Sequence, residues 1–198
     1  MKEDILEQLV DDFLQSKGYF TKKNIKFKPD WQHPDFQSKK DSNHSDVDVI
    51  GINPNIQGPD RVWVVSCKSW QSGFDPGTII RAIEQKKIMS GRDAWKAFRE
   101  LVEPKWTQAF LAAVKELTAC ESFTYVTAVT KLFGDKTQWE NYPPFISSLR
   151  GNPIRLITLQ EMAKSILPNL NTTLASSDLG RTLQLLKTAE CLDADLSN

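Results

Sequence analysis

Histidine and cysteine, the residues that most often bind zinc, are scarce in this sequence. The 198 residues include two histidines, His33 and His44, and three cysteines, Cys67, Cys120 and Cys191. No histidine pairs with a cysteine or with the other histidine at zinc-ligand spacing, so we expect no structural zinc site. The cysteines are odd in number and far apart, which is typical of a reducing compartment and predicts no disulfide framework. The scarcity of histidine also disfavours hydrolases whose nucleophile needs a histidine base.

Motifs of several large enzyme classes are missing as well. The sequence has no Gly-x-Ser-x-Gly elbow, no glycine-rich phosphate loop and no dinucleotide-binding fingerprint. It has no apolar run near the roughly 20 residues that span a bilayer. Its start, MKEDILEQLVDD, is acidic and amphipathic, unlike a signal peptide. We therefore expect a soluble, cytoplasmic protein.

An excess of charge of one sign is also absent. The chain has 25 Lys and Arg and 25 Asp and Glu, so no global positive field attracts polyanions. The balance nevertheless conceals local differences. Residues 17–40 contain seven lysines and two aspartates, residues 81–99 contain six basic and two acidic residues, and residues 2–12 contain one lysine and five acids. The two basic segments favour a local nucleic-acid surface, although solvated helix faces and loops would explain the same charges.

What the sequence does contain is enough apolar material for one globular domain, with 40% hydrophobic and 10% aromatic residues. Apolar periodicity and turn residues predict the following elements. Helices are expected at 3–17, 78–89, 93–119 with a break at Pro104, 160–167 and 178–189, strands at 19–28, 48–52, 62–69, 123–132 and 153–159, and a long loop at 29–45. This order predicts an α/β domain over residues 1–169, with a small mixed central sheet flanked by helices, and a C-terminal helical extension over residues 170–198.

Two of the short strands carry polar side chains that packing alone does not readily explain. In SDVDVIGI, Asp46 and Asp48 are two residues apart and so share a face of the strand. In VVSCKSW, Ser66 and Lys68 share a face. A lysine in a strand built from Val, Trp and Cys is costly unless an anion faces it, and Asp48 supplies one, directly or through a metal and a phosphate. The alternative is that the aspartates are turn residues and Lys68 protects a sheet edge.

Taken together, these residues resemble the PD-(D/E)XK nuclease superfamily, which has the restriction-endonuclease-like fold of Mrr-type restriction enzymes and archaeal Holliday junction resolvases. The resemblance runs from residue 3 to about residue 167. It consists of a helix acid, Glu7 in LEQLVDDFLQSKGYF, a strand acid, Asp48 in DVDVIGI, and Lys68 in SCK. It implies a restriction-endonuclease-like version of the small mixed sheet flanked by helices.

The same resemblance implies a divalent cation, Mg²⁺ or Mn²⁺, at the site. Asp48, Glu7 and the main-chain carbonyl of Cys67 would bind the cation, with Asp46 as an outer companion. Two features depart from the family pattern. The proline before the aspartate is missing, and Ser66 stands where the family usually has Glu or Asp. A serine hydroxyl is a weaker ligand for a hard cation than a carboxylate, and Glu84 in the following helix is a candidate replacement.

The function implied is a divalent-metal-dependent DNA endonuclease that hydrolyses phosphodiester bonds in defence, such as restriction or anti-phage activity, or in DNA repair. Its catalytic residues would be Asp48, Lys68, Glu7 and Ser66, and it would act as a homodimer or as a subunit of a larger assembly. One alternative is a catalytically degenerate subunit of the same fold that binds nucleic acid or a protein partner. Another is an unrelated α/β interaction domain whose acids and lysine are surface features.

The expected nucleic-acid contacts come from the two basic segments and from one tryptophan. We expect phosphate contacts from Lys39, Lys40, Arg81 and Lys87, and base stacking on Trp70. Tryptophans in a chain of this size are more often core residues, so Trp70 has a structural alternative as well.

Overall fold

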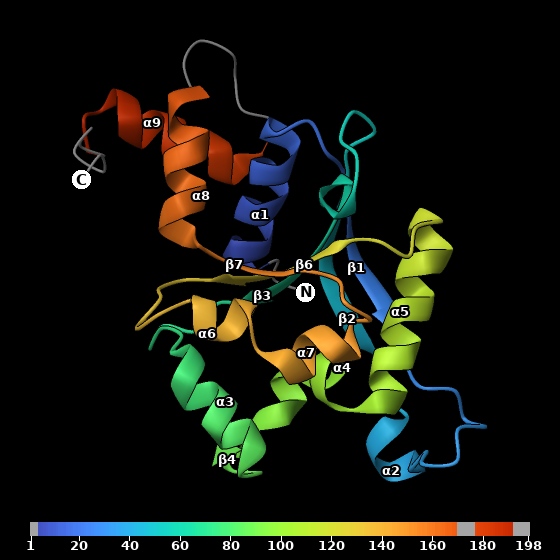
Figure 1. Cartoon of the computed structure of the whole chain (residues 1–198). Helices are drawn as coiled ribbons and strands as arrows, with labels where there is room; N and C mark the ends of the chain where they lie inside the picture. Colours follow the sequence, from blue (N-terminus) through green and yellow to red (C-terminus); the bar gives the residue numbers. More distant parts are fainter. Residues whose placement is uncertain (1–3, 170–176, 192–198) are drawn as a thin grey trace.

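The computed structural model describes residues 4–169 and 177–191, and its centre is a mixed five-stranded sheet (Figure 1). The strands lie in the order β1-β2-β3-β6-β7. Their bounds are Phe20–Phe27 for β1, Ser45–Ile52 for β2, Val62–Lys68 for β3, Thr124–Val129 for β6 and Ile154–Thr158 for β7. β2 pairs antiparallel with β1 and β3, whereas β6 pairs parallel with β3 and β7. The predicted α/β class with a small mixed central sheet is therefore confirmed.

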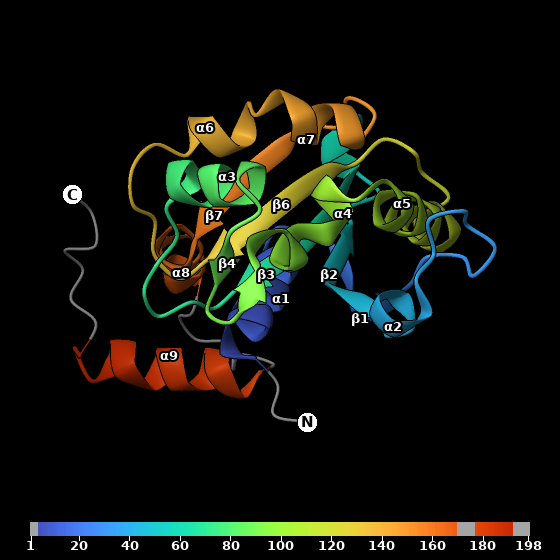
Figure 2. The same cartoon turned by 90° about the horizontal axis from the view of Figure 1, so that it is seen from below.

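Helices cover both faces of this sheet (Figure 2). One face carries α1 (Ile5–Ser16), α8 (Leu159–Ile166) and, packed on α1, α9 (Asp178–Thr188). The other face carries α3 (Pro76–Glu84), α4 (Arg99–Val102), α5 (Pro104–Thr118), α6 (Thr137–Glu140) and α7 (Pro143–Ser148). None of the helices in the described part of the chain is both long enough and apolar enough to cross a membrane. Because layers lie on both sides, β6 is buried along its whole length.

The apolar stripe predicted for the first helix forms the core on one face of the sheet. α1 begins after Asp4, whose side chain caps the helix by accepting a hydrogen bond from the backbone N–H of Leu6. The buried side chains of the helix are Leu6, Leu9, Val10, Phe13 and Leu14. They pack against Val49 of β2 and Val65 of β3. Each such side chain contributes roughly 1.5–3 kcal/mol on burial, so this face alone fixes α1 against the sheet.

The core on the other face is rich in aromatic side chains. The ring of Trp139 lies 4.8 Å from that of Phe98 and 4.9 Å from those of Phe74 and Phe145, centre to centre, at steep interplanar angles. The indole N–H of Trp139 donates to Thr127 Oγ1 at 2.9 Å. This tryptophan is therefore a core residue with its polar atom satisfied.

The helix predicted at 78–89 is wrong in its second half. α3 ends at Glu84, and the chain then forms a small hairpin of β4 (Ile88–Met89) and β5 (Arg92–Asp93). Lys86 has a φ of 51°, in the left-handed region that a right-handed helix does not allow. The hairpin therefore turns away from the helix axis.

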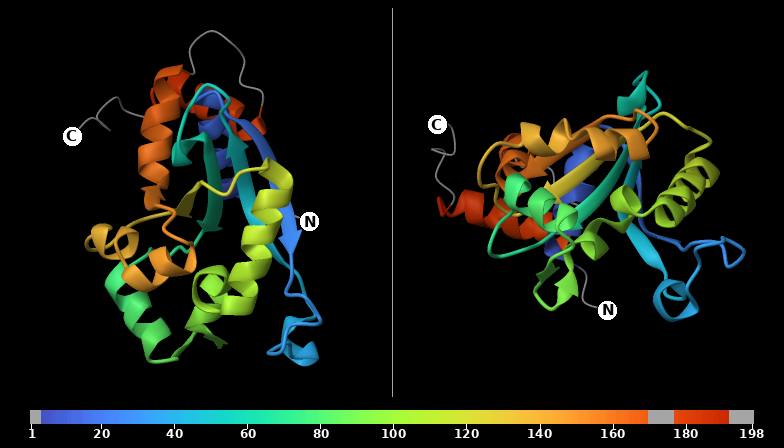
Figure 3. Two further views of the ribbon diagram at one scale, coloured as in Figure 1. Left: turned by 45° about the vertical axis from the view of Figure 1, so that its right-hand side comes forward. Right: turned by 60° about the horizontal axis from the view of Figure 1, so that its bottom comes forward.

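The long loop predicted at 29–45 contains a short helix. This helix, α2 (Ser38–Asp41), lies beyond the ends of β1 and β2 and next to the start of α5 (Figure 3). The helical segment predicted at 93–119 divides into η2 (Ala94–Phe98), α4 and α5, and Pro104 is the first residue of α5. Two further short turns are η1 (Pro59–Arg61) and η3 (Leu167–Asn169).

The predicted C-terminal extension falls partly outside the described residues, which omit 170–176 and 192–198. Within the part that is described, α9 confirms the helix predicted at 178–189. Leu179 and Leu183 of α9 pack against the core beneath α1. The helix is thus an additional layer on the α1 face.

β1 forms one edge of the sheet. Lys22 and Lys26 are exposed along it. Its pairing with β2 is interrupted at Asn24, which has a φ of 56° and lies level with Asp48. The irregularity therefore falls at the polar residue on which the site is built.

Candidate active site

β2 and β3 separate at one end of the sheet. Their antiparallel pairing stops at Val49 and Val65. Beyond that point β2 continues along β1 to Ser45, whereas β3 continues along β6 to Lys68. The two strands therefore form a fork, and polar side chains gather at its mouth.

Asp48 is the first residue of β2 inside the fork. Its Oδ2 atom accepts a hydrogen bond from the backbone N–H of Cys67 at 2.5 Å, in place of a strand partner. Burial raises the pKa of Asp48 from 3.8 to about 6, opposed by Lys68 and the Cys67 amide and assisted by the charges of Asp46 and Glu100. A desolvated carboxylate of this kind gains from a cation placed beside it.

Lys68 ends β3 and turns toward the α4 side of the sheet. Its Nζ donates a hydrogen bond to Ser66 Oγ at 2.8 Å and lies 5.2 Å from the centre of the Phe98 ring. No carboxylate in the described part of the chain is within ion-pair distance of this amine. Lys68 is thus held in place while its remaining N–H groups can meet an anion.

Ser66 lies between Lys68 and a buried acid. Ser66 is only 6% exposed, and its side chain lies near the phenol of Tyr125, whose pKa it lowers. The phenol donates to Glu100 Oε1 at 2.5 Å. Burial and the charge of Glu100 raise the pKa of Tyr125 well above its ordinary value, so the phenol keeps its proton. We call Asp48, Ser66, Lys68, Glu100 and Tyr125 the polar cluster.

Glu100 is the residue of this cluster that the sequence pattern did not indicate. It lies on α4, between the buried Phe98 and Leu101, and is itself only 7% exposed. An acid next to buried apolar residues is a weak signal of a buried partner. The partner, Tyr125, is on β6, far along the chain, so no local spacing could reveal the contact.

Cys67 and Glu7 lie on the opposite side of β3 from Lys68. The Cys67 side chain packs with the core beneath α1, and burial raises its pKa well above the ordinary value, with further increases from Asp48, Glu7 and Asp4. Ser69 Oγ also donates to the Asp4 carboxylate at 2.5 Å. The start of α1 is therefore attached to the end of β3, and the charge of Glu7 acts at the same strand end as Asp48.

Three other residues predicted for the site lie elsewhere. Glu84 is exposed at the end of α3 and accepts a hydrogen bond from the Tyr142 hydroxyl at 2.8 Å. Arg81 lines a separate pocket of about 510 Å³ between α3 and the α6–α7 segment. Lys87 is exposed in the turn before β4. The structure shows no contact between these side chains and the polar cluster.

Oxygen atoms are the donors that the fork offers to a cation. Among the described residues, no group of three or more His, Cys, Asp or Glu side chains is arranged to hold a metal ion. Asp48 and the main-chain carbonyl of Cys67 remain as donors. Mg²⁺ usually keeps several waters and binds one or two carboxylates together with substrate phosphates. This donor set fits a magnesium ion shared with a phosphate rather than a closed structural metal site.

A groove of about 1130 Å³ lies next to the polar cluster. It is bordered by α2, the loop after β3, the first turn of α3, the β4–β5 hairpin and η2. Its charged lining residues are Lys39, Lys40, Arg92, Lys96, Arg99, Asp75 and Asp93, and its tryptophans are Trp70, Trp95 and Trp106. We call it the basic groove, because cations outnumber acids. Of the five predicted nucleic-acid contacts, it contains Lys39, Lys40 and Trp70.

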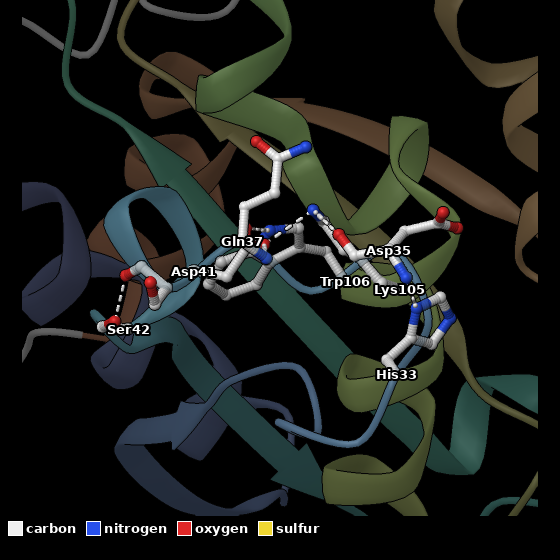
Figure 4. Close-up of polar contacts among 8 residues, drawn as sticks. His33, Asp35, Gln37, Asp41, Ser42, Lys105 and Trp106 are labelled. Carbon is white, nitrogen blue, oxygen red and sulfur yellow. Dashed lines mark hydrogen bonds and ion pairs between the residues drawn. The ribbon is translucent and has the colours of Figure 1, made fainter.

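One wall of the basic groove is fixed by a buried ion pair (Figure 4). Lys105 Nζ of α5 lies 2.7 Å from Asp41 Oδ2 of α2 and also donates to the carbonyl of Asp35 at 3.0 Å. The indole N–H of Trp106 donates to Asp41 Oδ1 at 3.2 Å, and the backbone N–H of Gln37 donates to Oδ2 at 2.8 Å. Burial alone would raise the pKa of Asp41, but the Lys105 and Gln37 hydrogen bonds lower it below its ordinary value. α2 is thereby attached rigidly to α5.

The structure thus brings Asp48, Ser66 and Lys68 together at the fork, with Glu7 and Cys67 on the other side of the same strand end. It places Glu84 outside this arrangement. Comparison with known proteins finds no protein family, no curated protein and no solved structure that matches this chain.

Proposed function

We propose that this chain is a divalent-metal-dependent nuclease that hydrolyses the phosphodiester bonds of DNA, in defence or in DNA repair. The observation that carries the proposal is the fork, where the half-buried carboxylate of Asp48 and the amine of Lys68 lie near one another at the ends of two diverging strands. The strand order, with antiparallel pairs followed by parallel pairs, supports the restriction-endonuclease-like version of the fold. A homodimer or a larger assembly is part of the proposal, because cutting both strands of a duplex needs two sites.

The chemistry needs a deprotonated water and stabilisation of the negative charge that develops on the phosphate oxygens. Asp48 and the carbonyl of Cys67 would hold Mg²⁺ or Mn²⁺, which supplies Lewis acidity and lowers the pKa of bound water. Lys68 offers its remaining N–H groups to the phosphate oxygens. Glu7, on the α1 side of the same strand end, adds negative charge that favours the cation.

The link between Lys68 and Glu100 explains how the site can tolerate a serine at position 66. An acid at this position would place a negative charge directly beside Lys68. Here the acid is Glu100, and the side chains of Tyr125 and Ser66 lie between it and Lys68. Lys68 keeps a fixed orientation, which is what stabilisation of a transition state requires.

A second candidate is a subunit of the same fold that binds nucleic acid or a protein partner without cutting. The observation that favours it is that Asp48 and Lys68 already have internal hydrogen-bond partners, while no described group of three metal-binding side chains is present. In that case the basic groove would bind the partner, and the polar cluster would be a network that stabilises the fold.

The deciding experiment incubates the purified protein with linear, circular, single-stranded and branched DNA in Mg²⁺, Mn²⁺ or EDTA. We expect metal-dependent cleavage that is lost in Asp48→Ala and falls about 10²–10³-fold in Lys68→Ala. Glu116→Ala, which removes an exposed acid of α5, is the matched control and should cut normally.

Absence of cleavage on every substrate, with binding intact, would favour the non-cutting subunit. Cleavage that survives Asp48→Ala would contradict the assignment of the site.

A further inference from the structure

The basic groove is too large and too charged for a small neutral ligand. Its volume of about 1130 Å³ exceeds the roughly 300–1,000 Å³ of typical small-molecule sites. Among its lining residues, five are Lys or Arg and two are Asp. Lys39 and Lys40 are exposed on α2, at one side of the groove. A long polyanion is the ligand that matches both the volume and the charge.

Tryptophans line the same groove as the cations. Trp70 is half-buried, with its ring stacked on Phe74 at 5.8 Å and an interplanar angle of 23°. Trp95 is half-buried on η2, and the ring of Trp106 is covered by the guanidinium of Arg99 at 4.5 Å. Trp70 and Trp95 can therefore offer an aromatic surface to a ligand. Bases inside a duplex are already stacked and cannot reach such a surface, whereas unpaired bases can.

The basic groove lies beside the fork. Trp70 follows Lys68 by two residues, and its ring lies 6.0 Å from that of Phe98, edge to face. Phe98 also contacts Lys68, whose Nζ lies 5.2 Å from the ring centre. Arg99, which lines the groove, is also close enough to Asp46 for that acid to act on its pKa. A nucleic-acid strand in the groove would therefore reach the polar cluster.

We infer that the basic groove binds an unpaired strand of nucleic acid, with bases stacked on Trp70 and Trp95 and phosphates bound by Lys39, Lys40 and Arg92. The inference rests on the proposed function, because it names the form of nucleic acid that the polar cluster would meet. The ion pair between Asp41 and Lys105 makes this groove a preformed site, since it holds α2 and its two lysines in place.

The test measures binding by fluorescence anisotropy in EDTA, with the whole protein and labelled oligonucleotides. The oligonucleotides are about 15 nucleotides long, near the upper end of the length that one single-strand-binding domain covers. The three probes are oligo-dT, oligo-rU and a blunt duplex of the same length. We expect both single strands to bind at least tenfold more tightly than the duplex. The DNA and RNA probes then show which sugar the groove prefers.

Two kinds of variant separate the contributions. Trp95→Ala should weaken single-strand binding by about 5- to 100-fold, while Trp95→Phe, which keeps an aromatic ring, should retain most of it. Lys39→Glu should weaken binding. It should also reduce the slope of the logarithm of the binding constant against the logarithm of the salt concentration by about 0.7 for each phosphate contact that is lost. The matched controls are Trp31→Ala, a tryptophan that is 74% exposed outside the groove, and Lys22→Glu on β1.

Equal or tighter binding of the duplex would overturn the inference, and so would a Trp95→Ala effect no larger than that of Trp31→Ala. These outcomes are independent of cleavage. If the protein binds single strands but cuts no DNA, the inference about the groove is supported and the proposed nuclease function is contradicted. If it cuts DNA but prefers the duplex, the nuclease function is supported and the inference about the groove is contradicted.

Discussion

Lys68 and Glu100 are linked through Ser66 and Tyr125, although they lie on different elements of the fold. Lys68 donates a hydrogen bond to the Ser66 hydroxyl at one end, the Tyr125 hydroxyl donates to Glu100 at the other, and Ser66 lies near enough to Tyr125 to lower its pKa. Buried networks in which every donor and acceptor is satisfied hold their members more firmly than the separate contacts would. The orientation of Lys68 therefore depends on residues that do not touch it.

Breaking this link at Tyr125 tests that dependence. Tyr125→Phe removes the donor to Glu100 and leaves a buried acid without its partner, so we expect a loss of about 1–3 kcal/mol in the free energy of unfolding. Cleavage should slow about tenfold or more, with the effect on kcat rather than KM. Because Ser66→Ala breaks the same link, the double variant should lose little more activity than either single variant. Fully additive effects in this cycle would show that the two hydroxyls act separately.

Placing an acid at position 66 tests where Ser66 points. Ser66→Glu adds a carboxylate beside Asp48 and close to Glu100, so without metal we expect a less stable protein. Mn²⁺ should restore the stability, and calorimetry should show a lower Kd for Mn²⁺ than in the wild type. Metal binding equal to that of the wild type would place Ser66 outside the metal site.

Asp48→Asn should separate stability from activity. The pKa of Asp48 is raised from 3.8 to about 6, so its ionised form destabilises the fold at neutral pH by about 3 kcal/mol. Asparagine carries no charge and can still accept the hydrogen bond from the Cys67 amide. We expect a higher Tm than wild type near pH 7.5 in EDTA, no increase in Tm on adding Mn²⁺, and no cleavage. A lower Tm in EDTA would mean that the charge of Asp48 is already balanced within the protein.

The ion pair between Asp41 and Lys105 predicts an acid-sensitive contribution to stability. Its hydrogen bonds lower the pKa of Asp41 below 3.8, so ionised Asp41 stabilises the fold above that value, and the stabilisation is lost as the pH falls through the lowered pKa. Asp41→Asn should cost about 3–5 kcal/mol near pH 7, because Lys105 is left buried without its partner. Urea unfolding between about pH 2 and pH 7 should show the difference between variant and wild type shrinking at the acid end. A constant difference would assign the cost to packing.

Local pattern predicted much of the fold. The apolar stripe predicted α1, and the pattern of β2 and β3 predicted that Asp48, Ser66 and Lys68 would lie on two neighbouring strands. Both signals depend only on residues that are close in the chain. The β4–β5 hairpin was missed because Ile88 fits a helical apolar face, yet it is 71% exposed. Lys86, two residues before Ile88, adopts a left-handed conformation that apolar periodicity does not reveal.

Contacts between distant segments account for the rest. Asp41 and Lys105 are 64 residues apart in the chain, and Tyr125 and Glu100 are 25 apart. Neither pair has a spacing that marks it, because sheet topology brings the residues together. The segment at 29–45 had the composition of a loop, and only its buried partner on α5 explains why it is ordered.

The exposed lysines of β1 have a consequence for assembly. A second copy that extended the sheet by pairing along this edge would place Lys22 and Lys26 close to like charges on an antiparallel neighbour, which destabilises such a pair. Sheet-to-sheet extension is therefore disfavoured at β1. If two copies act together on one duplex, they must meet through another surface, and their two forks would be arranged by that surface rather than by a continuous sheet.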